Sequence, residues 1–277
     1  MSSETDPLAR IADALARLIP APVAPVDWHA EPAYVWDQAA RPVTRIIAPP
    51  LALLKGIDAQ KADVTANVAR LAAGHAAHDM LLWGARGMGK SALLRASVAA
   101  AQEADVSRLA LVQVAPEALA SLNRLFAILG AVDRRFLVFI DDLGFEDGDS
   151  TGPRALRSWL EGGVEARPGN VRLAITSNRR AIVPRHLSEQ DDPINPRDAV
   201  DDRLALADRF GLSIGFHNCS QDDYLAIISG YCSAHNLDWA EADALEWSKR
   251  RGARSGRVAW QFVTELAGRA GRALDAP

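Results

Sequence analysis

Apolar positions along the chain form two alternating patterns, which predict strands and helices in turn. Short apolar runs have the length and composition of buried strands, at residues 80–83, 108–114, 136–140, 171–177 and 212–216. Longer stretches before and between them are rich in helix formers or repeat apolar positions at helical spacing, at residues 58–71, 91–101, 116–129 and 153–160. Strands that alternate with helices predict a parallel sheet with right-handed crossovers.

The two ends of the chain have different patterns. From residue 220 onward the apolar spacing is purely helical, and Ser220 is a suitable N-cap for the first of three predicted helices. Residues 6–20 predict a short amphipathic helix, and residues 21–50 are rich in proline, which favours extended chain or turns. Three aromatic residues of this arm are expected to anchor it on the body of the protein: Trp28, Tyr34 and Trp36.

These patterns divide the chain into three parts. Residues 1–50 are the N-terminal helix and proline-rich arm, residues 51–217 are the α/β domain, and residues 218–277 are a helical domain. With 277 residues and 49% apolar side chains, the chain is long enough for one large domain or two modest ones with a real core.

The turn after the first predicted strand of the sheet carries a phosphate-binding motif. Residues 84–91 fit the pattern G-x-x-x-x-G-K-[ST], and they stand between a strand and a helix, as that motif requires. All eight residues are candidates for contact with a nucleotide: Gly84, Ala85, Arg86, Gly87, Met88, Gly89, Lys90 and Ser91. The alternative, a glycine turn with a solvated lysine, does not account for the four fixed positions together.

The residue types in this loop match the chemistry of a polyphosphate. Glycines let successive backbone N–H groups turn inward, and the N-terminus of the following helix attracts the same anion. Lys90 is expected to reach the β- and γ-phosphates, and Ser91 is expected to ligate Mg²⁺. Arg86 adds a cation that the motif does not demand. The predicted ligands are therefore ATP and Mg²⁺.

Polar residues follow two of the later strands. Asp141 and Asp142 come directly after the strand at residues 136–140, and Asn178 ends the strand that begins at Val171. Parallel sheets bind ligands at the carboxyl ends of their strands. Asp141 is predicted to hold Mg²⁺, Asp142 to activate water, and Asn178 to bind the γ-phosphate and that water. The alternative is an Asp-Asp turn and a strand-end cap with no chemistry.

Two apolar residues ahead of the loop are candidates for the adenine pocket. Leu54 and Ile57 precede the first helix of the α/β domain, where apolar side chains often cover a nucleotide base. They are equally well explained as ordinary core residues, and the sequence leaves both interpretations open.

Charge and cysteine content narrow the set of partners. The net charge of −4 offers no general attraction to nucleic acid or membrane. The two cysteines suggest neither a disulfide framework nor a zinc site, and no apolar run is long enough to span a membrane, so a soluble cytoplasmic protein is expected. Residues 249–272 nevertheless hold seven basic side chains and one acid. This segment is interpreted as a solvated basic face that opposes the acidic loop of a neighbouring chain, and a nucleic-acid contact is the alternative.

Taken in order, these motifs resemble those of the AAA+ ATPases. More narrowly, the chain resembles the DUF815 family of bacterial ATP-binding proteins, through runs that begin at Phe139, Leu160, Thr176, Leu206 and Ser220. The resemblance covers roughly residues 28–270. It implies an α/β P-loop NTPase fold: a three-layer, five-stranded parallel sheet with a small C-terminal helical lid domain.

The resemblance also implies roles for three arginines. Arg209 lies in an Asp-Arg-Phe-Gly run where related motors place an arginine finger, and Arg203 is the second choice for that role. Arg257 matches the arginine of the lid domain that touches bound nucleotide. Since an arginine finger acts on a neighbouring subunit, the resemblance implies a homo-oligomer, which could be a ring.

Two departures from the AAA+ pattern affect the expected function. Motors of this class carry glutamate where Asp142 stands, so hydrolysis could be slow, or Glu146 could replace it. The aromatic pore loop of protein-threading motors is absent after the strand at residues 108–114. The expected function is an oligomeric Mg²⁺-dependent ATPase that remodels or regulates a macromolecular partner. The alternatives are a nucleotide-gated binding module with little or no hydrolysis, and a DNA-dependent motor.

Overall fold

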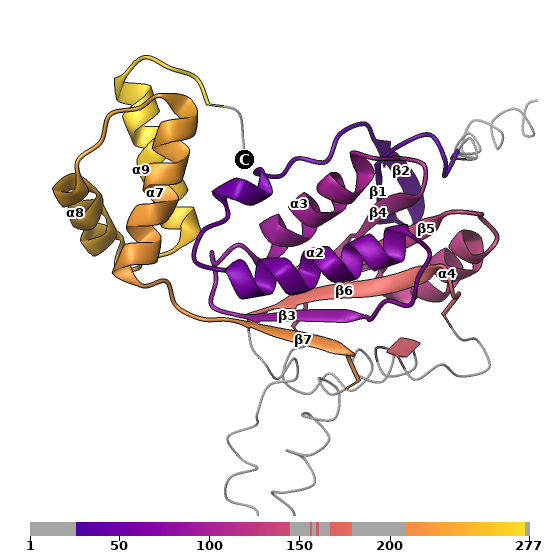
Figure 1. Cartoon of the computed structure of the whole chain (residues 1–277). Coiled ribbons are helices and arrows are strands. Elements are labelled where there is room, and N and C mark those ends of the chain that lie inside the picture. Colours follow the sequence, from indigo (N-terminus) through magenta and orange to yellow (C-terminus); the bar gives the residue numbers. More distant parts are fainter. Residues whose placement is uncertain (1–25, 145–155, 157–158, 161–166, 179–208, 275–277) are drawn as a thin grey trace, which may run out of the picture.

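The computed structural model describes residues 26–144, 156, 159–160, 167–178 and 209–274 (Figure 1). The predicted N-terminal helix lies outside these residues, as does most of the helix predicted at residues 153–160. Glu146 and Arg203 also lie outside them.

A sheet of seven strands forms the centre of the protein, in the order β2-β1-β4-β5-β6-β3-β7. All five predicted strands are present and pair in parallel: β3 (Met80–Gly84), β4 (Leu109–Val114), β5 (Arg135–Ile140), β6 (Val171–Ser177) and β7 (Leu212–Phe216). Because β3 pairs with both β6 and β7, its carboxyl end lies between two later strands. This arrangement confirms the parallel α/β sheet that the alternating pattern predicts.

The sheet has two strands more than the five predicted, and both come from the proline-rich arm. β1 (Ala33–Asp37) and β2 (Ala39–Val43) form an antiparallel hairpin, and β1 also pairs in parallel with β4. Pro42 lies in β2, the edge strand, where a residue without an N–H need not interrupt the ladder. The proline-rich composition of the arm therefore concealed a pair of strands at one edge of the sheet.

The arm is held to the body by buried side chains, as predicted. Trp28, Tyr34 and Trp36 are all buried, and the Trp36 Nε1–H donates to the Ser121 hydroxyl at 2.8 Å. The Arg134 guanidinium donates to the Trp28 carbonyl at 2.6 Å, and burial lowers the pKa of this guanidinium. The hairpin is therefore an integral edge of the sheet.

Helices cover both faces of the sheet, and strand residues alternate between them. Helices α2 (Asp58–Ala72) and α3 (Lys90–Gln102) lie side by side on one face, while η2 (Pro116–Ser121) and α4 (Leu122–Gly130) lie on the other (Figure 1). Along β5, Leu137 and Phe139 pack toward α2 and α3, whereas Phe136 and Val138 pack toward α4. The result is three layers.

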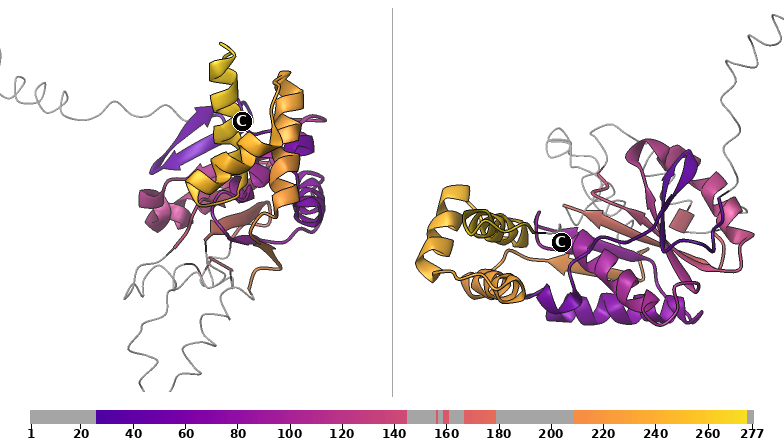
Figure 2. Two further views of the ribbon diagram at one scale, coloured as in Figure 1. Left: turned by 90° about the vertical axis from the view of Figure 1, so that its left-hand side faces the viewer. Right: turned by 90° about the horizontal axis from the view of Figure 1, so that it is seen from above.

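Three helices form a separate bundle, the lid, beyond the carboxyl end of β7 (Figure 2). They are α7 (Gln221–His235), α8 (Glu241–Arg251) and α9 (Gly256–Arg269). Ser220 and Asp223 make a reciprocal capping box at the start of α7, and Ser255 caps α9 by accepting from the Val258 N–H. None of the helices among the described residues is long and apolar enough to cross a membrane.

Candidate functional site

The turn between β3 and α3 depends on glycine. Gly84, Gly87 and Gly89 all have positive φ, at 124°, 74° and 89°. A Cβ on Gly84 would lie 2.0 Å from the Phe216 carbonyl oxygen, so no side chain fits there. Gly89 is the N-cap of α3, and the helix therefore begins at Lys90 with its first N–H groups directed at the loop.

Lys90 lies inside this loop. Its ammonium donates to the carbonyls of Gly84 and Ala85 at 2.8 and 2.9 Å, and the residue is only 7% exposed. Burial lowers the pKa of the Lys90 ammonium, and the nearby carboxylates of Asp142 and Asp141 oppose that shift. A buried cation of this kind favours an anionic ligand beside it.

Two hydroxyls fix the Asp141 carboxylate. The Ser91 and Thr176 hydroxyls both donate to Asp141 Oδ1 at 2.6 Å, joining α3, β5 and β6 at one point. The Thr176 oxygen also accepts the Asp142 N–H at 2.8 Å. Thr176 is buried and is a site residue that the sequence prediction missed. The only available signal was a polar side chain two positions before Asn178, near the carboxyl end of the strand.

Asp142 adopts a backbone conformation in the left-handed region, with φ at 53°, which Asp tolerates better than most residues. The Asn178 amide donates to Asp142 Oδ1, and Arg86 Nη2 lies 3.7 Å from Oδ2. Side chains predicted separately from the loop, from β5 and from β6 are therefore brought together at the carboxyl ends of adjacent strands.

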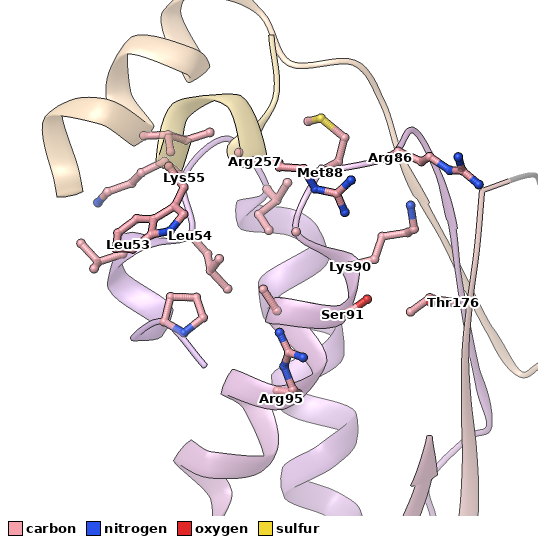
Figure 3. A pocket seen from close by; sticks show the side chains of 18 of the residues that line it. Leu53, Leu54, Lys55, Arg86, Met88, Lys90, Ser91, Arg95, Thr176 and Arg257 are labelled. Atoms are coloured by element: carbon pink, nitrogen blue, oxygen red, sulfur yellow. The ribbon is translucent and has the colours of Figure 1, made fainter. Parts of the chain in front are cut away.

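These groups line one wall of a cavity of about 560 Å³ between the sheet and the lid (Figure 3). That volume is typical of a site for a small ligand. Most of the predicted site residues line it: Leu54, Ile57, Arg86, Gly87, Met88, Gly89, Lys90, Ser91, Asp141, Asp142, Asn178 and Arg257. Gly84 and Ala85 do not line it, but they supply the carbonyls that hold Lys90.

Leu54 and Ile57 fit both interpretations left open by the sequence. Both are buried in the hydrophobic core, and both line the cavity. A Cβ on Gly89 would lie 3.7 Å from Ile57 Cδ1 and 4.0 Å from Leu54 Cδ2, so both side chains stand directly over the loop.

The lid supplies the remaining wall. The Arg257 N–H donates to the Gly87 carbonyl at 3.2 Å, and the Arg257 side chain extends over the loop beside Met88 (Figure 3). Tyr231 of α7 and Trp260 of α9 line the cavity, with ring centroids 4.9 Å apart and planes inclined at 62°. Sequence periodicity placed both aromatics on lid helices but could not show that they reach the site. Other lining residues that it missed are Pro49, Leu53, Lys55, Ala92, Arg95, Ile227 and Gly256.

Arg209 is not brought to this cavity. It lies three positions before Leu212, the first residue of β7, and Leu212 pairs with Met80 at the start of β3. The phosphate-binding motif begins at Gly84, the last residue of β3. Arg209 therefore lies toward the amino ends of β3 and β7, whereas the loop of its own chain lies at the carboxyl end of β3.

The basic segment at residues 249–272 is not a uniform patch of solvated cations. Four of its basic side chains contact other residues of the lid: Arg250 with Glu246, Arg269 with Glu265, Arg251 with the Trp247 ring, and Arg272 with the His235 and Asn236 carbonyls. Arg257 faces the cavity. Two of these contacts are surface ion pairs, in which the Arg250 and Arg269 side chains are 72% and 71% exposed, so the segment still presents cations to solvent.

The donor set suits Mg²⁺ better than a metal held entirely by protein. Across the described part of the chain, no three His, Cys, Asp or Glu side chains gather around one point. Ser91 and Asp141 offer a hydroxyl and a carboxylate at one place. Mg²⁺ is commonly held by one or two protein oxygens together with phosphate oxygens and water. The residues present therefore fit Mg²⁺ that arrives with a nucleotide.

Solved structures with the same fold belong to the P-loop AAA+ ATPases. The Thermotoga maritima RuvB Holliday junction branch migration motor has 18% identity and a TM-score of 0.53, over 82% of this chain and 68% of that one. The Aeropyrum pernix ORC2 protein has 15% identity and a TM-score of 0.54, over 82% and 66%. The Aeropyrum pernix ORC1 protein, solved in complex with DNA, has 15% identity and a TM-score of 0.52, over the same shares.

The sheet, the glycine turn and these likenesses define an AAA+ fold. Within that class the chain belongs to the DUF815 family, whose profile, described as "Protein of unknown function (DUF815)", matches residues 29–270. No curated protein matches the sequence. The expected family and fold class are both confirmed.

Proposed function

We propose that this protein binds ATP with Mg²⁺ in the cavity between the sheet and the lid, and hydrolyses the β–γ phosphoanhydride to act on a macromolecular partner. One observation carries the proposal: the loop lysine, Ser91 and both carboxylates converge on one side of the cavity. The triphosphate lies along the loop from Gly84 to Ser91, with Lys90 exchanging its two carbonyl contacts for phosphate oxygens.

Each polar residue has a separate task in the proposed reaction. Water attacks the γ-phosphorus as its bond to the β–γ bridging oxygen breaks, and ADP and inorganic phosphate leave. Asp142 orients the water and accepts its proton, while Asn178 holds Asp142 in place. Ser91 and Asp141 would hold Mg²⁺, which neutralises charge on the β- and γ-oxygens when bound.

The apolar end of the cavity accounts for the base. Leu54 and Ile57 stand on one side, with Tyr231 and Trp260 of the lid among the other lining residues. An aromatic and aliphatic lining is suited to a purine ring. Arg257, whose backbone already contacts Gly87, would sense the phosphates from the lid.

Arg209 is proposed to act on a neighbouring chain. Its position just before β7, at the end of the strands away from its own loop, supports this assignment, because an arginine supplied in trans can stabilise the transition state. A homo-oligomer follows from this assignment. Measuring the molecular mass in solution with and without ATP, for the unchanged chain and for Arg209→Ala, tests it.

A direct test of the main proposal is calorimetric titration with Mg²⁺ and ATP, together with phosphate release. We expect Lys90→Ala to abolish the heat of ATP binding and to lower the rate of phosphate release by a factor of about 10³ or more. The reason is that the loop loses its only buried cation for the β- and γ-phosphates. Lys249→Ala removes an exposed α8 lysine outside the cavity and is the matched control. Absence of binding heat with the unchanged chain would refute the proposal.

A nucleotide-gated binding module is the second candidate. Asp142 favours it, because the carboxylate is one methylene shorter than glutamate and is already engaged by Asn178 and Arg86. This candidate predicts ATP binding with phosphate release no faster than in Lys90→Ala.

A further inference from the structure

Arg86 is a cation at a position of the phosphate-binding loop where the motif allows any residue. It lies between Gly84 and Gly87, and its guanidinium extends on the same side of the loop as the Lys90 ammonium (Figure 3). Its nearest ionic partner is Asp142, with Nη2 3.7 Å from Oδ2.

The Arg86–Asp142 ion pair is weak because both side chains are exposed and the two charged groups are far apart for an ion pair. Both side chains are mainly exposed, at 74% and 59%, and the distance is near the upper limit for an ion pair. Exposed pairs of this kind contribute little to stability, so Arg86 can exchange Asp142 for a stronger anion at almost no cost. Arginine is suited to that exchange because its planar fork binds two phosphate oxygens at once.

The geometry also defines which anion is available. Lys90, Ser91 and Asp141 are the groups that the proposed function assigns to the β- and γ-phosphates and their metal, and Asp142 lines the same cavity. Arg86 belongs to the loop, and its guanidinium lies beside the Asp142 carboxylate. Since Arg86, Lys90 and Asp142 line one cavity, the γ-phosphoryl group of a nucleotide held by the loop is the anion within reach of the Arg86 guanidinium.

We infer that Arg86 is a catalytic residue acting within its own chain. This inference rests on the proposed ATPase function. As water oxygen bonds to the γ-phosphorus and the bond to the bridging oxygen breaks, Arg86 stabilises the charge on the γ-phosphoryl oxygens. By leaving Asp142 it also frees that carboxylate to accept the water proton. ADP and inorganic phosphate are the products.

This assignment separates two arginines by location. Arg209 lies at the end of the strands away from the loop and is proposed to act in another chain's site. Arg86 lies on the loop and acts in its own site. Each chain then carries a complete minimal set for hydrolysis before it meets a neighbour. Assembly through Arg209 would add to that basal rate.

The test compares Arg86→Ala and Arg86→Lys with Arg108→Ala. Arg108 is an exposed arginine paired with Asp105 at 3.1 Å, just before β4 and away from the cavity, and it is the matched control. Single-turnover phosphate release should fall by roughly 10²–10³-fold in Arg86→Ala, the usual cost of removing one preorganised donor. Arg86→Lys should restore only a small part, because an ammonium lacks the fork. ADP affinity should stay close to that of the unchanged chain.

Mixing two inactive variants tests whether Arg86 acts in its own chain. Lys90→Ala chains retain Arg86, so they could supply it to Arg86→Ala sites only across an interface. We expect the mixture to remain inactive. Recovery of turnover would overturn action within the chain, and an Arg86→Ala rate equal to the Arg108→Ala rate would overturn the catalytic role. If the unchanged chain binds no ATP, the proposed function fails as well. ATP binding without turnover in the unchanged chain overturns both the hydrolysis and this role.

Discussion

The two walls of the cavity are built on different principles. On the sheet side, hydroxyls and an amide hold the carboxylates: Thr176 bonds to Asp141 and to the Asp142 backbone, and Asn178 bonds to Asp142. On the lid side, the lining is aliphatic and aromatic, and the backbone bond from Arg257 to Gly87 ties α9 to the loop.

This difference suggests a division of work. Hydrogen bonds are directional, so the sheet wall presents a carboxylate pair whose geometry is set before any ligand arrives. Apolar contacts are non-directional, so the Tyr231 and Trp260 rings can hold a base without fixing its orientation through hydrogen bonds. Chemistry is therefore expected to depend on the sheet wall, and affinity for the nucleoside on the lid wall.

Among the changes that compare the two walls, the largest effect on turnover is expected from Thr176→Val, which keeps the β-branched shape and removes the hydroxyl. The change leaves the Asp142 N–H without its acceptor and Asp141 with one donor fewer. Partners that orient metal ligands typically contribute about 10–100-fold, so Mg²⁺-dependent turnover should fall by about that factor. The free energy of unfolding should drop by about 1–3 kcal/mol.

Thr176→Ser is the matched control, because it restores the hydroxyl and removes only a methyl group. Steady-state phosphate release across a range of Mg²⁺ concentrations is the measurement. If Thr176→Val shows the same Mg²⁺ dependence and rate as Thr176→Ser, the preorganised sheet wall is wrong.

Trp260→Ala on the lid wall is expected to have a smaller effect on turnover than Thr176→Val and to act on ATP affinity. Trp260 lines the cavity and packs edge-on against Tyr231. Loss of an aromatic stacking partner costs about 1–3 kcal/mol, so ATP binding should weaken by about 5–150-fold. Turnover at saturating ATP should change little, because the sheet wall is untouched.

Trp239→Ala controls for the loss of a tryptophan from the lid, since Trp239 packs on the core but does not line the cavity. Calorimetric titration with ATP and turnover at saturation are measured on both variants. A fall in saturated turnover with unchanged affinity would reverse the division of work between the walls.

The sequence predicted the sheet wall better than the lid wall, for a physical reason. Lys90 and Asp141 occupy positions that strand periodicity and chain connectivity determine, since parallel strands bring their carboxyl ends to one edge. The Tyr231 and Trp260 rings face the cavity because of how α7 and α9 pack, which no local pattern encodes. The sequence therefore predicted their helices but not their contribution to the site.

The two strands missed at the edge have a related explanation. Tyr34 and Trp36 alternate with Val35 in a segment where proline is frequent, and composition outweighed periodicity. β1 pairs locally with β2, but it joins the sheet through its parallel partner β4, which is distant in sequence. Non-local pairing of this kind is invisible to a reading based on neighbouring residues.

The smallest expected effect is a loss of folding stability at alkaline pH, which arises from groups on or next to α7 of the lid. Burial raises the pKa of the Cys232 thiol on α7 from 9.0 to about 11 and that of Cys219, just before α7, to about 11. Burial also raises the pKa of the Tyr224 hydroxyl on α7 to about 12. Between about pH 9 and 11 the unfolded chain releases thiol protons that the folded lid retains. Stability from these groups is therefore full below pH 9 and is lost as the pH rises.

Urea unfolding at a series of pH values from about 8 to 11 measures this loss. One titrating group contributes at most about 1.4 kcal/mol per pH unit, so Cys232→Ala should make the decline shallower by up to that amount. Ser233→Ala, at the adjacent exposed position of α7, is the matched control because it removes no titrating group. Parallel declines in the two variants would mean that the Cys232 thiol contributes nothing to the alkaline loss of stability, and this distinction between the lid and the sheet would lose its support.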